Sequence, residues 1–574
     1  MYISDHRQRS KAVFLSFLIF LLFCSGRLFF IQFFRSQYLV NLASKQHNFF
    51  VELEPLRGAI YDRNLKLQAV NIAVDSLYAS PSAISADDKE KVISKLTSVL
   101  GLDQGYLKDR LYRKKDFVWI KRKLSLAQSS RIKKLGLNGL GFLKESKRSY
   151  PNSYLTSHVI GFAGLDNTGL EGVESYYNDS LKGESGWAIF LRDARQKKLA
   201  LWEQMVLPKD GYDLVLTIDE VIQYIVEREI DQVVKKYNAD SASVIVMDPH
   251  TGAILALANR PTYNLNDYFK VTKDQIRNRA VCDMFEPGSV FKIVTLAAAL
   301  EEGEIKEEDK FFCEEGSYRV ASHTLHDHRP HGWLTFRDVI KLSSNIGTTK
   351  AAQILGPEII YKYMKLFGFG SKLEVDLLGE IPGVAKKPSR WSKVSIAAIP
   401  IGHEVGVTAL QLVSAISVIA NGGQLMKPYI VEEIRDKHGQ RIKKFDPLMI
   451  RKAISLDTAE RAKDILKSVV EEGTGRAANI PGISAAGKTG TAQKLNPDGT
   501  YSHSKFIASF MGFAPVEDPM VAIIVMVNNP HPVYFGGVVA APVFKNIAGD
   551  TIRYLKTSRP SYDTIALNES KDFN

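Results

Sequence analysis

Three short motifs of hydroxyl and amine side chains could together perform serine acyl transfer. They are Ser289-Val290-Phe291-Lys292, Ser343-Ser344-Asn345 and Lys488-Thr489-Gly490. A serine hydroxyl is a weak nucleophile at neutral pH and needs a base within hydrogen-bond reach. Each motif alone is common by chance. The set, in this order, is typical of serine acyl-transfer enzymes that use lysine where others use histidine.

The spacing of Ser289 and Lys292 suits a helix. Phe285-Glu286-Pro287-Gly288 predicts a tight turn, and apolar residues recur with helical period after Ser289. Lys292 would then lie on the same helix face, one turn beyond Ser289. Lysine acts as a base only when neutral, and burial together with the nearby ammonium of Lys488 would lower the Lys292 pKa. The helix N-terminus would also offer backbone N–H groups to an oxyanion.

The elements around the motifs predict a multidomain α+β protein. A hairpin pattern opens the C-terminal domain, and Lys488 falls on a later strand that turns at Asn496-Pro497-Asp498-Gly499. Upstream of residue 205, short alternating runs mix with charged helical stretches, which indicates a separate α+β domain. The predicted elements are strands at 69–74, 214–218, 242–247, 253–257, 487–494 and 504–513, and helices at 89–99 and 219–236.

Longer strings around these motifs resemble the class B penicillin-binding proteins, which are peptidoglycan D,D-transpeptidases, along nearly the whole chain. The surroundings of Asn345 resemble the division-type (FtsI-like) branch, since elongation-type relatives tend to carry Ser-x-Asp there. One departure is Leu65, which stands where the family usually has glycine and affects a turn. The strings that carry the resemblance are Pro55 to Asn64, Gly169 to Gly172 with Glu174, Phe285 to Lys292, Gly332 to Gly347, Gly487 to Gln493 and Gly536 to Phe544.

The resemblance implies a fold and a set of residue roles. The fold would be a single N-terminal transmembrane helix, an α+β pedestal (dimerisation-type) domain, and a transpeptidase domain with an antiparallel sheet flanked by helices, as in serine β-lactamases. No cofactor or metal would be needed. The implied roles are Ser289 as nucleophile, Lys292 as base, Ser343 as proton relay, Asn345 as a support for Lys292 and the substrate amide, Lys488 as the carboxylate-binding residue, Thr489, Gly490 and Thr491 as substrate contacts, and the N–H groups of Ser289 and Thr491 as the oxyanion hole.

The resemblance also implies partners and a place in wall synthesis. The partners would be peptidoglycan stem peptides, with a D-Ala-D-Ala donor and an amine acceptor, β-lactams, a membrane glycan polymerase and divisome proteins, but not nucleic acid. The implied role is septal crosslinking during division. An elongation-type enzyme remains an alternative. A membrane-anchored β-lactam sensor or β-lactamase would not need the strings before residue 175, and a non-catalytic division scaffold would not need all three motifs.

The N-terminus predicts a membrane anchor. Basic residues precede a mainly apolar stretch from Ala12 to Phe34, in which Arg27 is the only charged residue and which is long enough to span a bilayer. The basic leader predicts an inside N-terminus and an outside body. The resemblance implies that the membrane is a bacterial cytoplasmic membrane. A cleaved signal peptide is the alternative to an anchor, but no Ala-x-Ala cleavage site follows the apolar stretch. The expected organisation is leader 1–11, anchor 12–34, pedestal 35–205, transpeptidase domain 206–556 and polar tail 557–574.

Composition and charge restrict the other classes. Three cysteines in 574 residues exclude a disulfide scaffold, and we expect Cys282 and Cys313 to be unpaired. The net charge of +12 is concentrated in residues 101–150, which hold fourteen Lys or Arg against four acidic residues. Outside a cell, such a surface suits anionic wall polymers, lipid head groups or an acidic partner. A solvated basic face is the simpler interpretation.

Two further patterns are resolved by their context. Gly482 to Thr489 matches the phosphate-loop pattern, but the predicted strand at 487–494 replaces the helix that a phosphate loop requires. Four histidines, at 323, 326, 328 and 331, surround Asp327, and imidazole and carboxylate are zinc ligands. Pro330 and Gly332 predict a loop, so a substrate-side or structural loop is favoured over a metal site.

Overall fold

The computed structural model describes residues 2–39, 48–115, 117–192, 198–496, 498 and 500–558. The chain divides into two compact units. The first contains Met1–Leu56 and Gly183–Gly211, and the second contains Arg57–Lys182 and Tyr212–Asn574. The polar tail beyond Ser558 lies outside the described residues.

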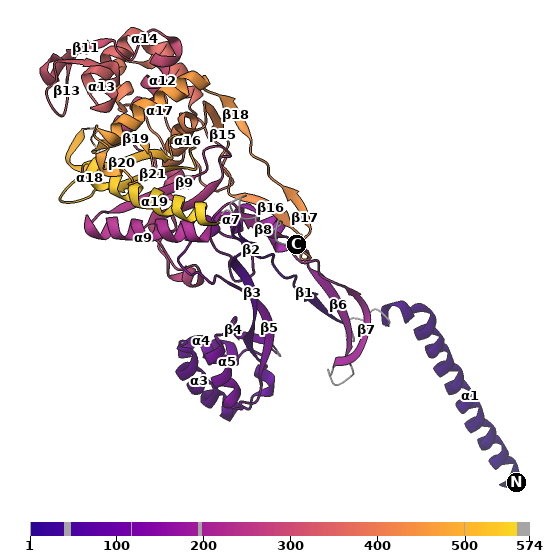
Figure 1. The fold of residues 1–574 in the computed structure, drawn as a ribbon. Coiled ribbons are helices and arrows are strands. Elements are labelled where there is room, and N and C mark those ends of the chain that lie inside the picture. Colours follow the sequence, from indigo (N-terminus) through magenta and orange to yellow (C-terminus); the bar gives the residue numbers. More distant parts are fainter. Residues whose placement is uncertain are drawn as a thin grey trace, which may run out of the picture. The chain divides into compact units, whose positions relative to one another are not determined.

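The first unit combines a long helix and a small sheet (Figure 1). Helix α1 (Tyr2–Phe34) contains the predicted anchor without a break. Between Arg7 and Phe34 it is apolar and long enough to cross a membrane, and no other helix in the described ranges is. The sheet is antiparallel, in the order β1-β6-β7, and its strands are β1 (Asn48–Leu53), β6 (Gly186–Arg192) and β7 (Lys198–Val206).

The core of the second unit is an antiparallel sheet in the order β10-β9-β21-β20-β19. Its inner strands are apolar on both faces: Val244 and Val246 pack into one core, whereas Ile245 and Met247 pack into another. This follows from the two-residue period of a strand, which directs alternate side chains to opposite faces. The strands are β9 (Ser241–Met247), β10 (Ile254–Arg260), β19 (Ala486–Leu495), β20 (Tyr501–Ala514) and β21 (Val521–Asn528).

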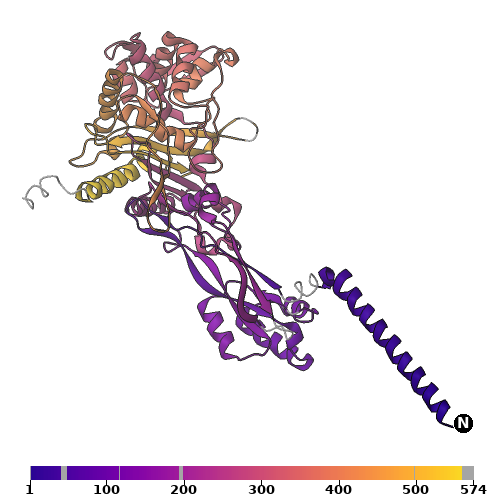
Figure 2. The same ribbon diagram turned by 90° about the vertical axis from the view of Figure 1, so that its right-hand side faces the viewer.

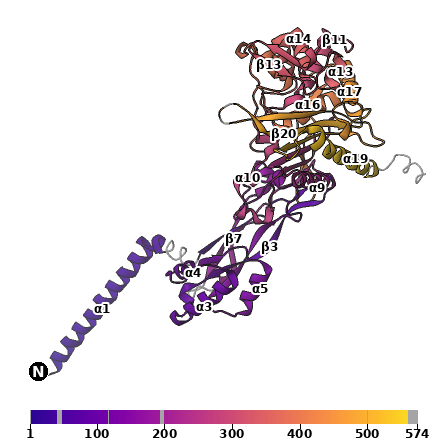
Figure 3. The same ribbon diagram turned by 90° about the vertical axis from the view of Figure 1, so that its left-hand side faces the viewer.

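Helices cover both faces of this sheet (Figures 1 and 3). Helices α9 (Glu220–Lys236) and α19 (Ala541–Ser558) pack on one face, where α19 is the yellow helix of Figure 2. The other face shares a core with α12 (Lys292–Glu302), α14 (Asn345–Leu366), α16 (Ala409–Ala420) and α17 (Leu456–Glu471). The predicted antiparallel sheet flanked by helices is therefore confirmed.

A second sheet joins parts of the chain that are far apart in sequence. Its order is β17-β16-β8-β2-β3-β4, with β5 also paired to β3. Strand β2 pairs in parallel with β8, so this sheet runs across the boundary predicted near residue 205. The strands are β2 (Ile60–Tyr61), β3 (Leu67–Ala79), β4 (Val118–Lys121), β5 (Leu140–Ser149), β8 (Asp213–Leu216), β16 (Val431–Arg435) and β17 (Arg441–Lys444).

The turn between β2 and β3 contains Leu65, the departure from the family pattern. Leu65 has a φ of +61°, a left-handed conformation that glycine adopts at little cost. Asp62 Oδ1 holds this turn by accepting hydrogen bonds from the backbone nitrogens of Asn64 (2.8 Å) and Lys66 (2.7 Å). The turn therefore keeps a glycine-like shape without glycine.

Short elements complete the second unit. A helical lobe of α3 (Ala86–Leu100), α4 (Gln104–Leu111) and α5 (Leu126–Lys134) encloses a small core of its own and carries much of the basic window. The others are α6 (Ser157–Ile160), α7 (Gly172–Tyr176), α8 (Asn178–Lys182), α10 (Lys273–Ile276), α11 (Arg279–Cys282), β11 (Lys310–Phe312), β12 (Ser317–Val320), β13 (His323–His326), β14 (Trp333–Thr335), α13 (Phe336–Lys341), α15 (Ser395–Ala398), β15 (Gln424–Met426), β18 (Met449–Lys452) and α18 (Gly536–Val539).

Candidate active site

Ser289 lies in a tight turn that precedes the predicted helix. Gly288 has a φ of +60°, and Gly288–Phe291 form a single 3₁₀ turn, so the α-helix begins at Lys292 and not at Ser289. The backbone N–H of Lys292 donates to the carbonyl of Ser289. A 3₁₀ turn has three residues, so Lys292 still lies directly beyond Ser289 on the same face.

Lys292 is fully buried at the start of α12. Its Nζ atom donates to the carbonyl oxygen of Ser343 (2.7 Å), to Ser343 Oγ (3.2 Å) and to Asn345 Oδ1 (2.8 Å). Burial lowers the Lys292 pKa to about 7, against the opposing effects of Asp327 and Cys313. A large fraction of this amine is therefore neutral at physiological pH, as a general base must be.

Lys488, on the sheet, lies close to Ser343. Its side chain is fully buried, and its Nζ atom lies 2.9 Å from Ser343 Oγ and 3.2 Å from the carbonyl oxygen of Thr489. Burial and the charge of Lys292 lower the Lys488 pKa well below its usual range. Ser343 Oγ therefore lies within hydrogen-bond distance of two amines, and protonation of either amine disfavours protonation of the other.

Ser343 owes its position to an unusual backbone conformation between α13 and α14. Its φ is +62°, and a non-glycine residue in this region costs about 1–3 kcal/mol. The next residue, Ser344, begins α14 by accepting a hydrogen bond from the backbone nitrogen of Gly347 (2.9 Å). This sharp helix entry turns the Ser343 hydroxyl toward the lysines.

Asp327 holds this helix entry, a role that the sequence did not indicate. Its Oδ1 accepts from the backbone nitrogens of Asn345 (2.5 Å) and Ile346 (3.1 Å), and its Oδ2 accepts from Ser344 Oγ (2.6 Å). A carboxylate is favourable at a helix N-terminus. The only sequence signal for Asp327 was its position among histidines. Its partners at the start of α14 lie too far along the chain for a local sequence pattern to reveal the contact.

The histidine-rich segment supports the motif through its backbone. The carbonyl oxygen of His326 accepts a hydrogen bond of 2.9 Å from Asn345 Nδ2, and the ring of His328 contacts that of Phe535 with centroids 5.1 Å apart. Within the described ranges, no three His, Cys, Asp or Glu side chains gather as a metal site. All three cysteines are free, including Cys282 and Cys313, as expected.

Thr489, Gly490 and Thr491 lie on β19, in the predicted strand. Thr489 Oγ1 is 2.9 Å from Thr474 Oγ1, and Thr491 Oγ1 accepts from the backbone nitrogen of Gly536 (3.1 Å). A side chain at Gly490 would meet Ser509 and Val290, so glycine permits β19 to pack against the turn of Ser289. No helix follows the phosphate-loop pattern, because β19 runs through it.

The structure thus gathers the predicted residues at one place. Lys292, Ser343, Asn345 and Lys488 are linked by hydrogen bonds, and Ser289 lies one turn before Lys292. Ser289 Oγ has no hydrogen-bond partner among the residues that the structure describes, and such contacts often tighten only when substrate binds. In the sheet as described, β19 is an edge strand, so alternate backbone N–H groups are open to an added peptide.

Comparisons with known proteins agree with this fold. The penicillin-binding protein dimerisation domain matches residues 52–216, and the penicillin binding protein transpeptidase domain matches residues 242–549. Stage V sporulation protein D of Bacillus subtilis is 38% identical over 95% of this chain and 85% of its own length. The peptidoglycan D,D-transpeptidase FtsI of Escherichia coli is 31% identical over 96% of this chain and 92% of its own length.

A solved structure agrees as well. Penicillin binding protein 3 from Mycobacterium tuberculosis superposes with a TM-score of 0.69 at 28% identity, covering 89% of this chain and 98% of its own. The chain belongs to the class B penicillin-binding proteins. It is a serine penicillin-binding transpeptidase.

Proposed function

We propose that this chain crosslinks peptidoglycan stem peptides during septal wall synthesis, with Ser289 as nucleophile and Lys292 as general base. One observation carries the assignment of the residues. The Lys292 amine is fully buried, has a pKa lowered to about 7, and shares Ser343 Oγ with Lys488. Burying an amine that forms no ion pair with a carboxylate is costly for folding. A role as the base in acyl transfer explains why such an amine lies beside a serine.

In the acylation step, Ser289 Oγ attacks the carbonyl carbon between the two terminal D-alanines of a donor stem. The hydroxyl proton passes to Lys292 Nζ, and the backbone N–H groups of Ser289 and Thr491 stabilise the oxyanion. The C–N bond then breaks. Ser343 relays the proton from Lys292 to the leaving amine, which departs as D-alanine and leaves an ester on Ser289.

In the second step, the amine of an acceptor stem attacks this ester, and an amide crosslink forms as Ser289 regains its proton. Lys488 would bind the terminal carboxylate of the donor. A carboxylate beside Lys488 favours its ammonium form, which opposes the effect of burial. Asn345 holds the Lys292 amine through its Oδ1 atom and would also contact the substrate amide.

The proposed location is the bacterial cytoplasmic membrane, with the N-terminus inside and the catalytic unit outside. The basic residues in the first part of α1, before its apolar stretch, support this orientation. The proposed partners are a membrane glycan polymerase and divisome proteins. Arg27 supports a protein partner for α1, since a charge within an apolar helix is costly unless a partner or the interface receives it.

Depletion and imaging test the septal role. In cells that depend on this protein, we expect a fluorescent fusion of the full chain to gather at midcell. Its depletion should block division while elongation continues. Side-wall localisation with loss of cell width control would instead support the elongation-type alternative. Covalent labelling without steady hydrolysis of penicillin would exclude a β-lactamase.

A role in sporulation is the second candidate. It is favoured by the 38% identity to Stage V sporulation protein D of Bacillus subtilis, which extends over 95% of this chain. Normal vegetative division after deletion, with a defect confined to spores, would support this candidate over the septal one.

A further inference from the structure

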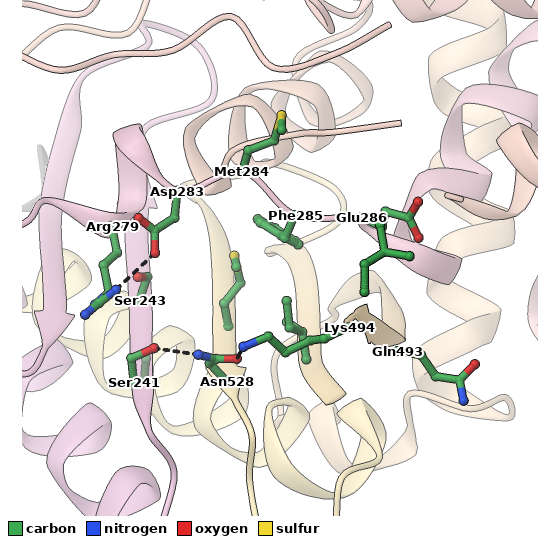
Figure 4. A pocket seen from close by; sticks show the side chains of 14 residues that line it. Ser241, Ser243, Arg279, Asp283, Met284, Phe285, Glu286, Gln493, Lys494 and Asn528 are labelled. Carbon is green, nitrogen blue, oxygen red and sulfur yellow. Dashed lines mark hydrogen bonds and ion pairs between the residues drawn. The ribbon is translucent and has the colours of Figure 1, made fainter. Parts of the chain in front are cut away.

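A pocket of about 270 Å³ lies beside the active site and is not used by the mechanism above. One wall is the segment that leads to Ser289, with Arg279 and Asp283 to Glu286. The other wall is the end of the five-stranded sheet, where β19 contributes Lys494 and β21 contributes Asn528 (Figure 4). The pocket therefore touches two of the three segments that carry the acyl-transfer residues, those of Ser289 and Lys488.

Arg279 brings a guanidinium group to the wall of this pocket. Its guanidinium forms ion pairs with Asp274 and with Asp283, the latter at 3.1 Å. The Nε–H group of Arg279 is buried and finds no acceptor in any residue that the structure describes. Because that nitrogen is buried, a molecule in the pocket would interact with the charge of the guanidinium and would not contact Nε.

Lys494 supplies a second cation. Its Nζ atom donates to Asn528 Oδ1 (3.0 Å), and Figure 4 shows its side chain reaching toward Asn528. Burial lowers the Lys494 pKa, with smaller effects from Asp240, Lys505, Asp283 and Arg279. Among the described residues this ammonium has only an amide acceptor, so an anion would stabilise it further.

The acidic residues of the pocket do not oppose an anion strongly, because each already has partners. Asp283 is paired with Arg277 and Arg279. The Glu286 carboxylate accepts from His403 Nδ1 (2.8 Å), Tyr501 (3.0 Å) and the backbone nitrogen of Glu404 (2.8 Å). The remaining lining includes apolar side chains, among them Met284, Phe285, Ile507 and Met526.

We propose that this pocket binds the carboxylate end of a D-amino acid or a short peptide, as a second subsite separate from Ser289. The carboxylate would contact Lys494 Nζ near the Arg279 guanidinium, and a methyl-sized side chain would contact the apolar lining. Two sources share this chemistry: the carboxylate of a stem peptide, and the free D-alanine that acylation releases. The inference rests on the transpeptidase activity proposed above for the choice of these two ligands.

Binding to the acylated protein tests this subsite. Full-length protein in detergent is first acylated at Ser289 with benzylpenicillin, so that the catalytic site is blocked. N-acetyl-D-alanyl-D-alanine and D-alanine are then titrated separately, and binding is followed by saturation-transfer NMR. We expect at least one to bind, and the C-terminal amide of the bound ligand, which lacks the carboxylate, to bind at least about tenfold more weakly.

Variants link the binding to the pocket. Lys494→Met should weaken binding at least about tenfold, whereas Lys494→Arg, which keeps the cation, should retain most of it. Lys235→Met is the matched control, because Lys235 is an exposed lysine on α9 and is not among the charges that act on Lys494. Penicillin labelling before the titration shows that each variant is folded and acylated.

The outcomes separate the sources and can reject the subsite. Binding of the dipeptide alone identifies a stem-peptide subsite, and binding of D-alanine identifies a product site. Absence of binding for both ligands, or equal binding by wild type and Lys494→Met, would overturn the proposal. Failure of penicillin to acylate Ser289 at all would instead reject the catalytic assignment, so the two failures are distinguishable.

Discussion

Asp327 Oδ1 accepts a hydrogen bond of 2.5 Å from the backbone nitrogen of Asn345. This contact holds the first turn of α14, and the helix entry in turn orients Ser343 and Asn345 toward Lys292. We therefore expect Asp327→Asn to slow acylation by a fluorescent penicillin at least about tenfold, because a charged acceptor at a helix N-terminus is lost.

The same substitution should also shift the pH profile of acylation. The Asp327 carboxylate raises the Lys292 pKa, so its removal should lower that pKa and move the acidic limb to lower pH. A loss of packing alone would reduce the rate without this shift. Asp436→Asn is a matched control, since Asp436 accepts backbone hydrogen bonds in an exposed turn away from the site.

Ser289→Ala should abolish covalent penicillin labelling and leave the fold intact, because the hydroxyl is the proposed nucleophile and has no hydrogen-bond partner among the described residues. Intact-protein mass spectrometry after incubation with penicillin provides the measurement, and the thermal unfolding midpoint provides the control for folding. Full labelling of the alanine variant would remove Ser289 from the mechanism.

Lys292→Arg should reduce acylation at least about a hundredfold, the lower range for a general base. Arginine keeps a positive charge but stays protonated, so it cannot accept the serine proton. Stopped-flow measurement of the acylation rate constant tests this. An unchanged rate would assign the base to another group, and Lys488 would be the first to examine.

The acylation rate of the wild-type protein should depend on pH through Lys292. Its pKa of about 7 in the folded protein implies that the rate rises between pH 6 and 7 and levels off above about pH 8. Stability should change in the same direction. Since the unfolded chain binds this proton up to about pH 10.5, folding is favoured increasingly as pH rises from about 7 to that value. A rate that still increases at pH 9 would contradict a lowered Lys292 pKa.

The sequence predicted those features that depend on local patterns. The strand that carries Lys488, the helix at 219–236 and the hairpin of β9 and β10 all appear close to their expected bounds. The motif residues also meet as expected. Their types and order specify the chemistry, and the resemblance to a family supplied the long-range arrangement that periodicity alone does not contain.

Features that depend on contacts between distant segments were not predicted. The parallel pairing of β2 with β8, the role of Asp327 at α14 and the pocket beside Lys494 each join segments without a shared local pattern. The 3₁₀ turn at Ser289 was missed for a different reason. Helical periodicity describes α12 well, but it does not distinguish the first turn of an α-helix from a preceding 3₁₀ turn.

Glu174→Gln should strongly destabilise the second unit. The Glu174 carboxylate is fully buried and forms ion pairs of 2.6 Å with both Arg57 and Arg148. Burial alone would raise its pKa, but the two guanidinium groups outweigh that effect and lower it. The stability from this carboxylate is therefore present above its unfolded pKa and is lost as pH falls through the lower folded value.

We expect a loss of about 3–5 kcal/mol, because both arginines would remain buried without their counter-charge. Denaturant unfolding followed by circular dichroism measures this loss. Glu90→Gln is the matched control, since Glu90 pairs with Lys108 at an exposed site and should change the free energy of unfolding by less than about 1 kcal/mol. Equal effects of the two substitutions would show that the buried network contributes no more than a surface pair.

Exchange of the anchor tests whether α1 does more than attach the protein to a membrane. Residues 12–34 are replaced by an unrelated single-pass helix, with the leader and the remainder of the chain unchanged. Because Arg27 is costly in an apolar helix unless a partner or the interface receives it, we expect the exchanged protein to bind penicillin normally but to support division poorly. The measurements are penicillin labelling of membranes and complementation of a depleted strain.

A second protein, with the native anchor and Arg27→Leu, separates the charge from the rest of the helix surface. Full complementation by both proteins would mean that the helix is only a tether and that Arg27 recognises no partner.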